Sequence, residues 1–314
     1  MHGERAEFCV FMQQGLAHCT PALGAVRGSV VSKWRVAALA VVKMLLVLAA
    51  ILAAMHGFRW LFMPQVQTAL KLDETTASAV RRAGILLSVV FAYWVSVRIV
   101  ERRAVVELRF APLGMGLGAL SGAAVISIVT VSLFAAGIYE VTAVRGLQSG
   151  LVGAAGLIFV AAMLEEVAFR GVIFRMLENA WGTLAALGLQ SLLFALQHLA
   201  NVEGADLAAS LTTLVSVTLI GAFWALVYVH TRNLWLVGAH HAAWNFAILL
   251  TGLPLSGLED WRGLAPLESR YLGPDWLTGG AFGPENSVLT MGLMVVCLAV
   301  LFYAARKRGR VIEV

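Results

Sequence analysis

The stretch from Gly150 to Asn179 places charged side chains inside an otherwise apolar run. Apolar and small residues lead directly into Glu165 and Glu166, and Arg170 follows about one helical turn later. A helix this apolar and this long is typical of a bilayer-spanning segment, which needs about 20 residues. An acid at the bilayer centre costs roughly 2.5 to 3.5 kcal/mol on insertion scales. These residues must therefore face protein, water or one another, which makes them candidates for a functional site.

The whole chain has the composition of a polytopic membrane protein. Its 314 residues are 60% hydrophobic and 13% charged, whereas soluble domains are about 45–50% apolar. The net charge of +5 comes from residues that cluster beside apolar runs, so it reports orientation in a membrane rather than nucleic-acid binding. The cysteines, Cys9, Cys19 and Cys297, have no paired spacing and support neither a disulfide framework nor a thiolate metal site.

The apolar runs predict an all-α bundle of about eight transmembrane helices with the functional site inside the membrane. Residues 1–33 mix charges and glycine without a sustained period, and we expect a flexible tail there. A single transmembrane domain is expected over 34–310. The predicted helices cover residues 36–56, 82–100, 114–138, 151–177, 183–200, 208–230, 234–252 and 287–305.

Basic residues at the ends of the predicted spans indicate the orientation. Eight spans put both termini on one side, together with the connection between the second and third spans. By the positive-inside rule this side is cytoplasmic, so we expect an integral protein of the cell (plasma) membrane with both termini in the cytoplasm. The basic residues expected there are Arg27, Lys33, Arg35, Arg98, Arg102, Arg103, Arg109, Arg306, Lys307, Arg308 and Arg310.

The connection 254–286 is the longest one between the predicted spans, and it falls on the outer side. Its Trp261, Tyr271 and Trp276 are residue types that favour membrane interfaces. The segment is therefore either an interfacial lid over the site or an ordinary surface loop.

The first intramembrane polar cluster is Glu165-Glu166-x-x-x-Arg170. Glu166 and Arg170 are four residues apart and share a helix face, whereas Glu165 points about 100° away and is left free of that ion pair. The pair either supports the site or is a structural ion pair that fixes helix register.

Two further clusters lie on other spans. Phe194-Ala-Leu-Gln-His198 ends the fifth span, and His240-His241-Ala-Ala-Trp-Asn245 lies in the seventh. In the predicted hairpin of spans four and five, Glu165 and His198 both sit roughly 22–26 Å from the turn near 180–182, so they can face each other. His241 is roughly 13 Å from its own turn, so we expect the hairpin to project beyond the membrane and the site to open toward the cytoplasm.

This set of side chains suits hydrolysis. A desolvated carboxylate can act as a base near neutral pH and, with His198, can deprotonate a water. His241 and Asn245 can donate hydrogen bonds to the oxyanion of an attacked amide. Glu165, His198 and His241 are also ligand types of a catalytic zinc site, so glutamate-dependent and metal-dependent mechanisms both stay open.

The three motifs, in this order on three spans, resemble those of the CPBP family of intramembrane proteases. That family joins type II CAAX prenyl endopeptidases with bacteriocin-processing and bacteriocin-immunity ("Abi") proteins, and the resemblance covers about residues 115–305. It implies an endopeptidase that hydrolyses a membrane-associated substrate, CAAX-like or leader-bearing, and the family has been labelled both metalloprotease and glutamate-dependent protease. By that resemblance the water is activated by Glu165 with His198, the oxyanion site is His241 with Asn245, and Glu166 and Arg170 support the site or orient the substrate.

Two other functions remain open from the sequence. A membrane scaffold or bacteriocin-immunity protein acts by binding alone. Acids and histidines in helix bundles also form proton relays in transporters, although the sequence shows no pair of related halves. The expected partners are a peptide or protein substrate at the membrane and the lipid bilayer, with no nucleic acid; zinc is the one cofactor that these residue types suggest.

Overall fold

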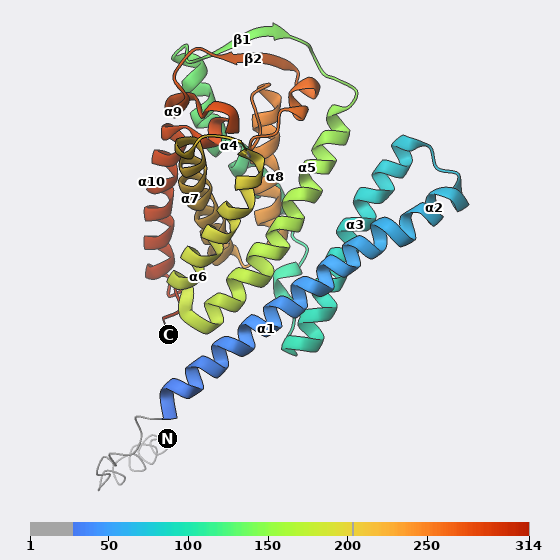
Figure 1. Ribbon diagram of the computed structural model, residues 1–314, viewed down its shortest axis with the longest axis vertical. Coiled ribbons are helices and arrows are strands. Elements are labelled where there is room, and N and C mark those ends of the chain that lie inside the picture. Colours follow the sequence, from blue (N-terminus) through green and yellow to red (C-terminus); the bar gives the residue numbers. More distant parts are fainter. Residues whose placement is uncertain (1–27, 203, 314) are drawn as a thin grey trace, which may run out of the picture.

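The computed structural model describes residues 28–202 and 204–313, so most of the tail expected at 1–33 lies outside the described residues. Long helices pack into one bundle, with a short strand pair at one end (Figure 1). The helices are α1 (Gly28–His56), α2 (Met63–Leu70), α3 (Glu74–Ser96), α4 (Pro112–Ala135), α5 (Leu151–Glu166), α6 (Arg175–His198), α7 (Leu207–Thr231), α8 (Leu234–Leu250), the short α9 (Asp275–Thr278) and α10 (Val288–Lys307).

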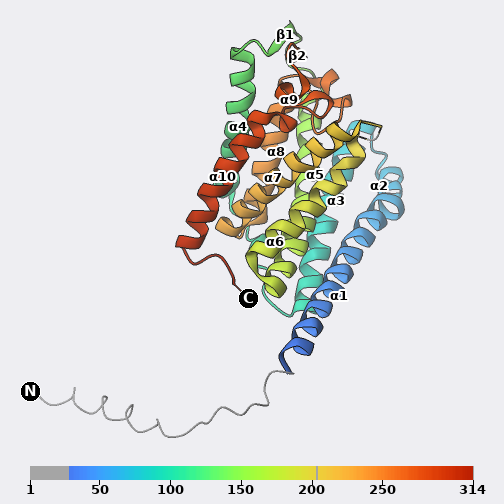
Figure 2. The ribbon, with the colours of Figure 1, turned by 60° about the vertical axis from the view of Figure 1, so that its left-hand side comes forward.

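The all-α membrane bundle predicted from the sequence is confirmed. Six stretches of the described chain are helical, long and apolar enough to cross a membrane, and Leu151–Val202 contains two of the predicted spans. Its 52 residues would rise about 78 Å as one straight helix. Gly182 has φ 80° and ψ 170°, which is outside helical geometry, and the chain turns back there. The part of α6 after Gly182 therefore runs back in the direction opposite to α5 (Figure 2).

Several helix boundaries differ from the predicted ones. The first span runs beyond residue 56, because α1 continues through a π-helical turn, Gly57–Phe62, into α2. α3 begins at Glu74 rather than near 82. The side chain of Asp73 accepts hydrogen bonds from the backbone N–H groups of Thr75 and Thr76 and so caps the start of this helix.

α8 is the short apolar helix at the centre of the bundle, with 17 residues. Its closest neighbour is α4, where Gly118 and Gly122 present a glycine face. A Cβ on Gly122 would lie 2.0 Å from the backbone oxygen of His240, and one on Gly118 would lie 2.4 Å from that of Leu236. This small-xxx-small spacing lets the two helix backbones touch, as it does in other membrane helix pairs.

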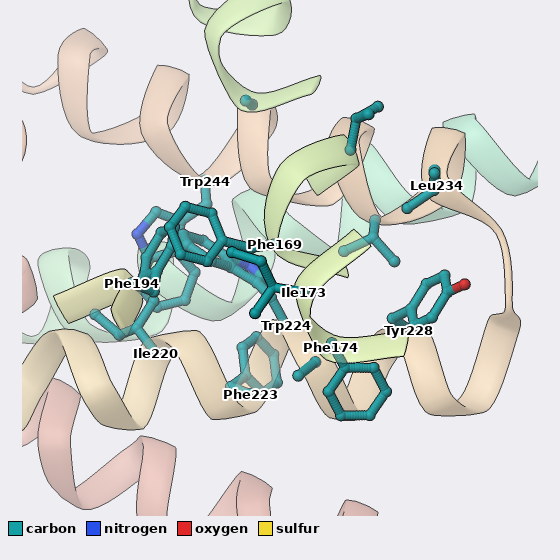
Figure 3. Close-up of a cluster of buried hydrophobic side chains, with 14 of the residues drawn as sticks. Phe169, Ile173, Phe174, Phe194, Ile220, Phe223, Trp224, Tyr228, Leu234 and Trp244 are labelled. Atoms are coloured by element: carbon teal, nitrogen blue, oxygen red, sulfur yellow. The ribbon is translucent and has the colours of Figure 1, made fainter. Parts of the chain in front are cut away.

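Aromatic side chains from α5 to α8 fill the interior (Figure 3). The ring of Trp224 on α7 lies edge-on to Phe194 of α6 and to Trp244 of α8, each with centroids 5.9 Å apart. Such pairs add about 0.5–1.5 kcal/mol each beyond the burial of their area. Large apolar side chains remain exposed on the outer surfaces of the bundle, as lipid-facing residues would be, including Leu39, Leu87, Leu120 and Val300.

Ion pairs hold together the end of the bundle at which α1 starts and α10 finishes (Figure 1). Arg175 at the start of α6 pairs with Glu101 after α3. Arg232 after α7 pairs with Glu178, which also accepts a 2.8 Å hydrogen bond from Thr183. These contacts join the connections between successive helices, where charged side chains can meet at the edge of the bilayer.

At the opposite end, the ribbon of β1 (Tyr139–Val144) and β2 (Leu267–Tyr271) pairs antiparallel, with Tyr139 opposite Tyr271. The strands link the α4–α5 connection to the connection 254–286. The hydroxyl of Tyr139 also donates a 2.6 Å hydrogen bond to the backbone oxygen of Thr278. The long connection is therefore a packed cap on this end of the bundle.

Candidate active site

The polar centre of the site is built around Glu166, which is fully buried at the end of α5. Its Oε1 accepts a 2.9 Å hydrogen bond from Nη1 of Arg170 and another of 2.9 Å from Nδ1 of His241. The first bond joins residues one turn apart on the same segment, and the second crosses to α8. Glu166 thus ties the first sequence cluster to the third.

Arg170 lies in the π-helical stretch Val167–Phe174 that continues α5, and its side chain is also fully buried. Its Nη2 donates a 2.9 Å hydrogen bond to the backbone oxygen of Gly221. The guanidinium lies 4.8 Å from the ring centroid of Phe194 and 5.6 Å from that of Trp224. Two aromatic faces and the carboxylate thus surround the cation, which compensates part of its desolvation.

His241 lies between the two adjacent acids. Its Nδ1–H is donated to Glu166, because a carboxylate oxygen can only accept, and its Nε2 is 3.8 Å from Oε2 of Glu165. The imidazole stacks on Trp224 with ring centroids 3.7 Å apart. Stacking and the hydrogen bond fix the ring so that its Nε2 faces Glu165.

Glu165 itself has no ion-pair partner closer than that 3.8 Å contact among the described residues, and its side chain is 27% exposed. The neighbouring Glu166 and Arg170 neutralise each other, so the carboxylate of Glu165 retains its capacity to accept protons and hydrogen bonds. Spacing on the helix predicts that Glu166 pairs with Arg170 and that Glu165 does not, and the structure shows this arrangement.

His198, at the end of α6, donates a 2.8 Å hydrogen bond from Nδ1 to the backbone oxygen of Phe194. A carbonyl can only accept, so Nδ1 carries the proton and Nε2 of the neutral ring is an acceptor. The His198 and Phe194 rings are 4.5 Å apart. The Phe-x-x-x-His motif therefore orients the imidazole through its own helical turn.

A cavity of about 110 Å³ brings the expected residues together. At about 30 Å³ per water in the liquid, it has room for several waters. α5, α6, α8 and the 3₁₀ turn Leu199–Val202 supply polar side chains, and the rest of the wall comes from apolar residues and from the connection 254–286. The predicted site residues on the wall are Glu165, His198, His241 and Asn245.

Asn245 contributes an unpaired group to this cavity. Its Oδ1 is buried without a hydrogen-bond partner among the described residues. Buried polar atoms without partners are uncommon, and each calls for an explanation such as a water or a ligand. An amide on the cavity wall whose oxygen has no partner is available to a water or a substrate.

The connection 254–286, and not the end that carries the termini, completes the cavity wall. Leu255, Ser256, Trp261, Phe282 and Glu285 of this connection line it. The expected opening toward the termini therefore does not match the lining of the cavity. Of the two readings of segment 254–286, a cover over the site fits this placement better than a detached surface loop.

A zinc ion is not accommodated by the described residues. No three side chains of histidine, cysteine, aspartate or glutamate converge closely enough there to hold a metal. The candidate ligands Glu165, His198 and His241 share the cavity, and because Nδ1 of His241 is bonded to Glu166 and that of His198 to Phe194, Nε2 is the ring nitrogen that each histidine has left as a possible ligand.

Two residues of the site, Trp224 and Glu285, were not predicted as site residues from the sequence. Trp224 packs against both Arg170 and His241, and Glu285 lies on the cavity wall with 3% exposure. Neither has a spacing that links it to the three motifs. The one available signal was the position of Trp244, directly before Asn245, on the helix that also carries His241.

Residues 146–247 match the family model described as type II CAAX prenyl endopeptidase Rce1-like. The family resemblance inferred from the three motifs is confirmed. The matched segment contains all three motifs and ends just after Asn245, so it is narrower than the 115–305 expected. The match supports, in general terms, a CAAX-type endopeptidase of the membrane, and with the apolar helices it identifies an integral membrane protein. No curated protein and no solved structure matches the chain.

Proposed function

We propose that the protein is an intramembrane endopeptidase in which Glu165 and His198 activate a water for attack on a peptide bond. The observation that carries this proposal is the single cavity on which Glu165, His198, His241 and Asn245 converge from three helices. The Rce1-like match over residues 146–247 supports the same class of reaction.

In the proposed reaction, a water lies between the carboxylate of Glu165 and Nε2 of His198, and both can accept its protons. Attack on the scissile carbonyl carbon forms a tetrahedral oxyanion, which the side-chain N–H of Asn245 can stabilise. When Nε2 of His241 carries a proton, it presents a second donor on the same side. The proton taken from the water is then delivered to the leaving nitrogen as the C–N bond breaks.

Glu166 and Arg170 have a supporting role in this proposal. Glu166 fixes the orientation of His241 through Nδ1, as a partner of the other ring nitrogen does in many histidine-based sites. Arg170 balances the charge of Glu166 and anchors the segment to Gly221 on α7. Neither side chain lines the cavity.

The substrate that we propose is a membrane-associated peptide with a CAAX-like carboxyl terminus. Wild-type protein in lipid vesicles should cleave a prenylated CAAX peptide, tested beside the same peptide without its prenyl group and a leader-bearing peptide. Glu165→Gln and His198→Ala should each lower kcat by roughly 100-fold or more, the range expected for loss of a general acid–base group. The readout is the rate of product release measured by mass spectrometry.

Two variants outside the cavity serve as controls. Glu140→Gln removes a carboxylate on the ribbon that pairs with Arg270, and His56→Ala removes an exposed imidazole at the end of α1. Both should keep wild-type turnover. Wild-type rates in Glu165→Gln and His198→Ala would refute the assignment of the pair, and cleavage restricted to the leader-bearing peptide would refute the CAAX substrate.

A further inference from the structure

Glu285 is a buried acid on the cavity wall that belongs to none of the three motifs. It lies in a short 3₁₀ turn, Pro284–Asn286, just before α10, and it is 3% exposed. It shares the cavity with Glu165, His198 and Asn245 but comes from the outer connection. A carboxylate in such a place is costly unless its oxygens are hydrogen-bonded.

Both oxygens of Glu285 are hydrogen-bonded, and they bind two different parts of the site. Oε1 accepts a 3.3 Å hydrogen bond from Nε1 of Trp244 on α8. Oε2 accepts a 2.6 Å hydrogen bond from the hydroxyl of Ser256 in the turn 254–258. One carboxylate therefore connects the turn over the cavity to the helix that carries two of the site residues.

The inward contact leads to the reacting groups. Trp244 directly precedes Asn245 on α8, so the two move together. The fully buried Trp244 ring packs edge-on against Trp224, and Trp224 stacks on His241. A change in the position of the Trp244 indole is thus transmitted to both residues expected at the oxyanion.

The outward contact fixes a turn with constrained backbone geometry. Ser256 has φ +49°, a left-handed conformation that is unfavourable for a residue with a Cβ. Its backbone oxygen accepts a 2.8 Å hydrogen bond from Nδ2 of Asn201, and the N–H of Gly257 donates a 2.8 Å bond to Phe282. A Cβ on Gly257, which has φ +81°, would lie 2.7 Å from the backbone oxygen of Asn201, so the turn is packed closely on the 3₁₀ turn Leu199–Val202 that follows α6.

We propose that Glu285 is a positioning residue that couples closure of the turn 254–258 over the cavity to the placement of Asn245 and His241. It acts through Trp244 and Ser256 and does not itself touch the scissile bond. A peptide that enters beneath this turn would then meet an aligned oxyanion site only when the turn is closed. This inference rests on the proposed endopeptidase function for its kinetic consequences, but its structural part can be tested without turnover.

The experiment compares four variants by hydrogen–deuterium exchange of residues 255–258 and by kcat and KM for peptide cleavage. Glu285→Ala removes both contacts, so exchange should rise and kcat/KM should fall by roughly tenfold or more, as expected for leaving buried donors unpaired. Glu285→Gln keeps an acceptor oxygen and should restore most of both. Ser256→Ala should raise exchange and KM, whereas Trp244→Phe should lower kcat and leave exchange unchanged.

Glu259→Gln, which changes an exposed carboxylate of the same connection that pairs with Arg262, is the matched control and should match wild type in every readout. If Glu285→Ala lowers only thermal stability, with kcat, KM and exchange of the folded protein unchanged, Glu285 is merely structural and the proposal is overturned. If Glu285→Ala does not fold, Ser256→Ala and Trp244→Phe decide, because each keeps the acid. Wild-type protein that cleaves no peptide refutes the endopeptidase function, and exchange in the variants then decides the coupling by itself.

Discussion

Two acids inside the helix bundle, Glu178 and Glu165, differ in how completely they are paired. Glu178, at the end with the termini, is 1% exposed, and its oxygens are held by Thr183 and Arg232. Glu165, in the cavity, is partly exposed and has only the 3.8 Å contact with His241. Under the proposed function, the comparison implies that acidity in a membrane helix is not enough for catalysis. The acid must also keep unused capacity to bind water or substrate.

Other polar groups near each acid differ in the same way, in how completely their hydrogen bonds are satisfied. Glu107, near Glu178's end of the bundle, accepts hydrogen bonds from Arg103 and Tyr93. Its burial acts to raise its pKa, but those hydrogen bonds hold the pKa below its ordinary value. Around the cavity, by contrast, the described residues leave Oε2 of Glu166 and Oδ1 of Asn245 without partners.

The largest expected effect is the difference in turnover between variants of the two acids. Glu165→Gln should abolish most turnover, by roughly 10²–10⁴-fold, without loss of folded protein, because it removes the proton acceptor alone. Glu178→Gln should lower the melting temperature, since it weakens the bond to Arg232, while the folded fraction keeps wild-type kcat. Turnover per folded molecule, normalised by size-exclusion chromatography, separates the two. Equal losses of turnover would remove the distinction between pairing and function.

The second effect concerns the buried ion pair of the site. Arg170→Met leaves Glu166 without its cation, and breaking such a pair from one side costs about 3–5 kcal/mol of folding stability. The double variant Glu166→Gln/Arg170→Met should recover part of this loss, because no unpaired charge remains. Arg270→Met, which breaks an exposed pair with Glu140, is the control and should cost under about 1 kcal/mol. Equal unfolding free energies in Arg170→Met and Arg270→Met would contradict this account.

A smaller effect is expected from the packing of α8. Gly122→Ala would place a Cβ 2.0 Å from the backbone oxygen of His240, so α8 must shift. Overpacking of this kind costs about 1–3 kcal/mol, and kcat should fall as well, because His241 moves with His240. Gly116→Ala, on the same helix with nothing within 4 Å, should leave stability and kcat close to wild type. Thermal unfolding and peptide cleavage, measured on both variants, check this prediction. A Gly122→Ala variant with wild-type stability and kcat would show that α4 does not set the position of α8.

The smallest effect is a pH dependence of stability. Burial raises the pKa of Glu285 above its ordinary value. As pH rises past that ordinary value, the unfolded chain loses the proton while the folded protein still binds it, so wild-type stability falls. Glu285→Gln cannot titrate, so the melting temperature of wild type minus that of the variant should become more negative between pH 4 and pH 7. A difference that stays flat over this range would show that the acid titrates normally.

The sequence was sufficient for much of the bundle because the relevant signals are local. Apolar length predicted the spans, and the four-residue spacing placed Glu166 and Arg170 on one face. Equal distances from the turn near Gly182 predicted that Glu165 and His198 could share a cavity. Each of these inferences needs only helical geometry and a short connection.

What the sequence did not reveal depends on the path of irregular chain. The β1–β2 ribbon joins connections that are far apart in sequence, and Glu285 reaches the cavity only because the connection 254–286 folds back over it. The hydrogen bond from His241 to Glu166 depends on how α8 is rotated against α5, which the contact with Gly118 and Gly122 of α4 helps to set. No periodic pattern in the sequence encodes that rotation.

The shortness of α8 has a consequence for the bilayer around the site. Its 17 residues rise about 26 Å, less than the roughly 30 Å thickness of a hydrocarbon layer. Past Thr251 the chain is irregular, and such backbone is stable at that depth only inside protein or beside water. We therefore expect the aqueous boundary to be drawn inward above this helix. The proposed hydrolysis would then need no separate water channel, and the charged ends of a cut peptide would have a short route back to solvent.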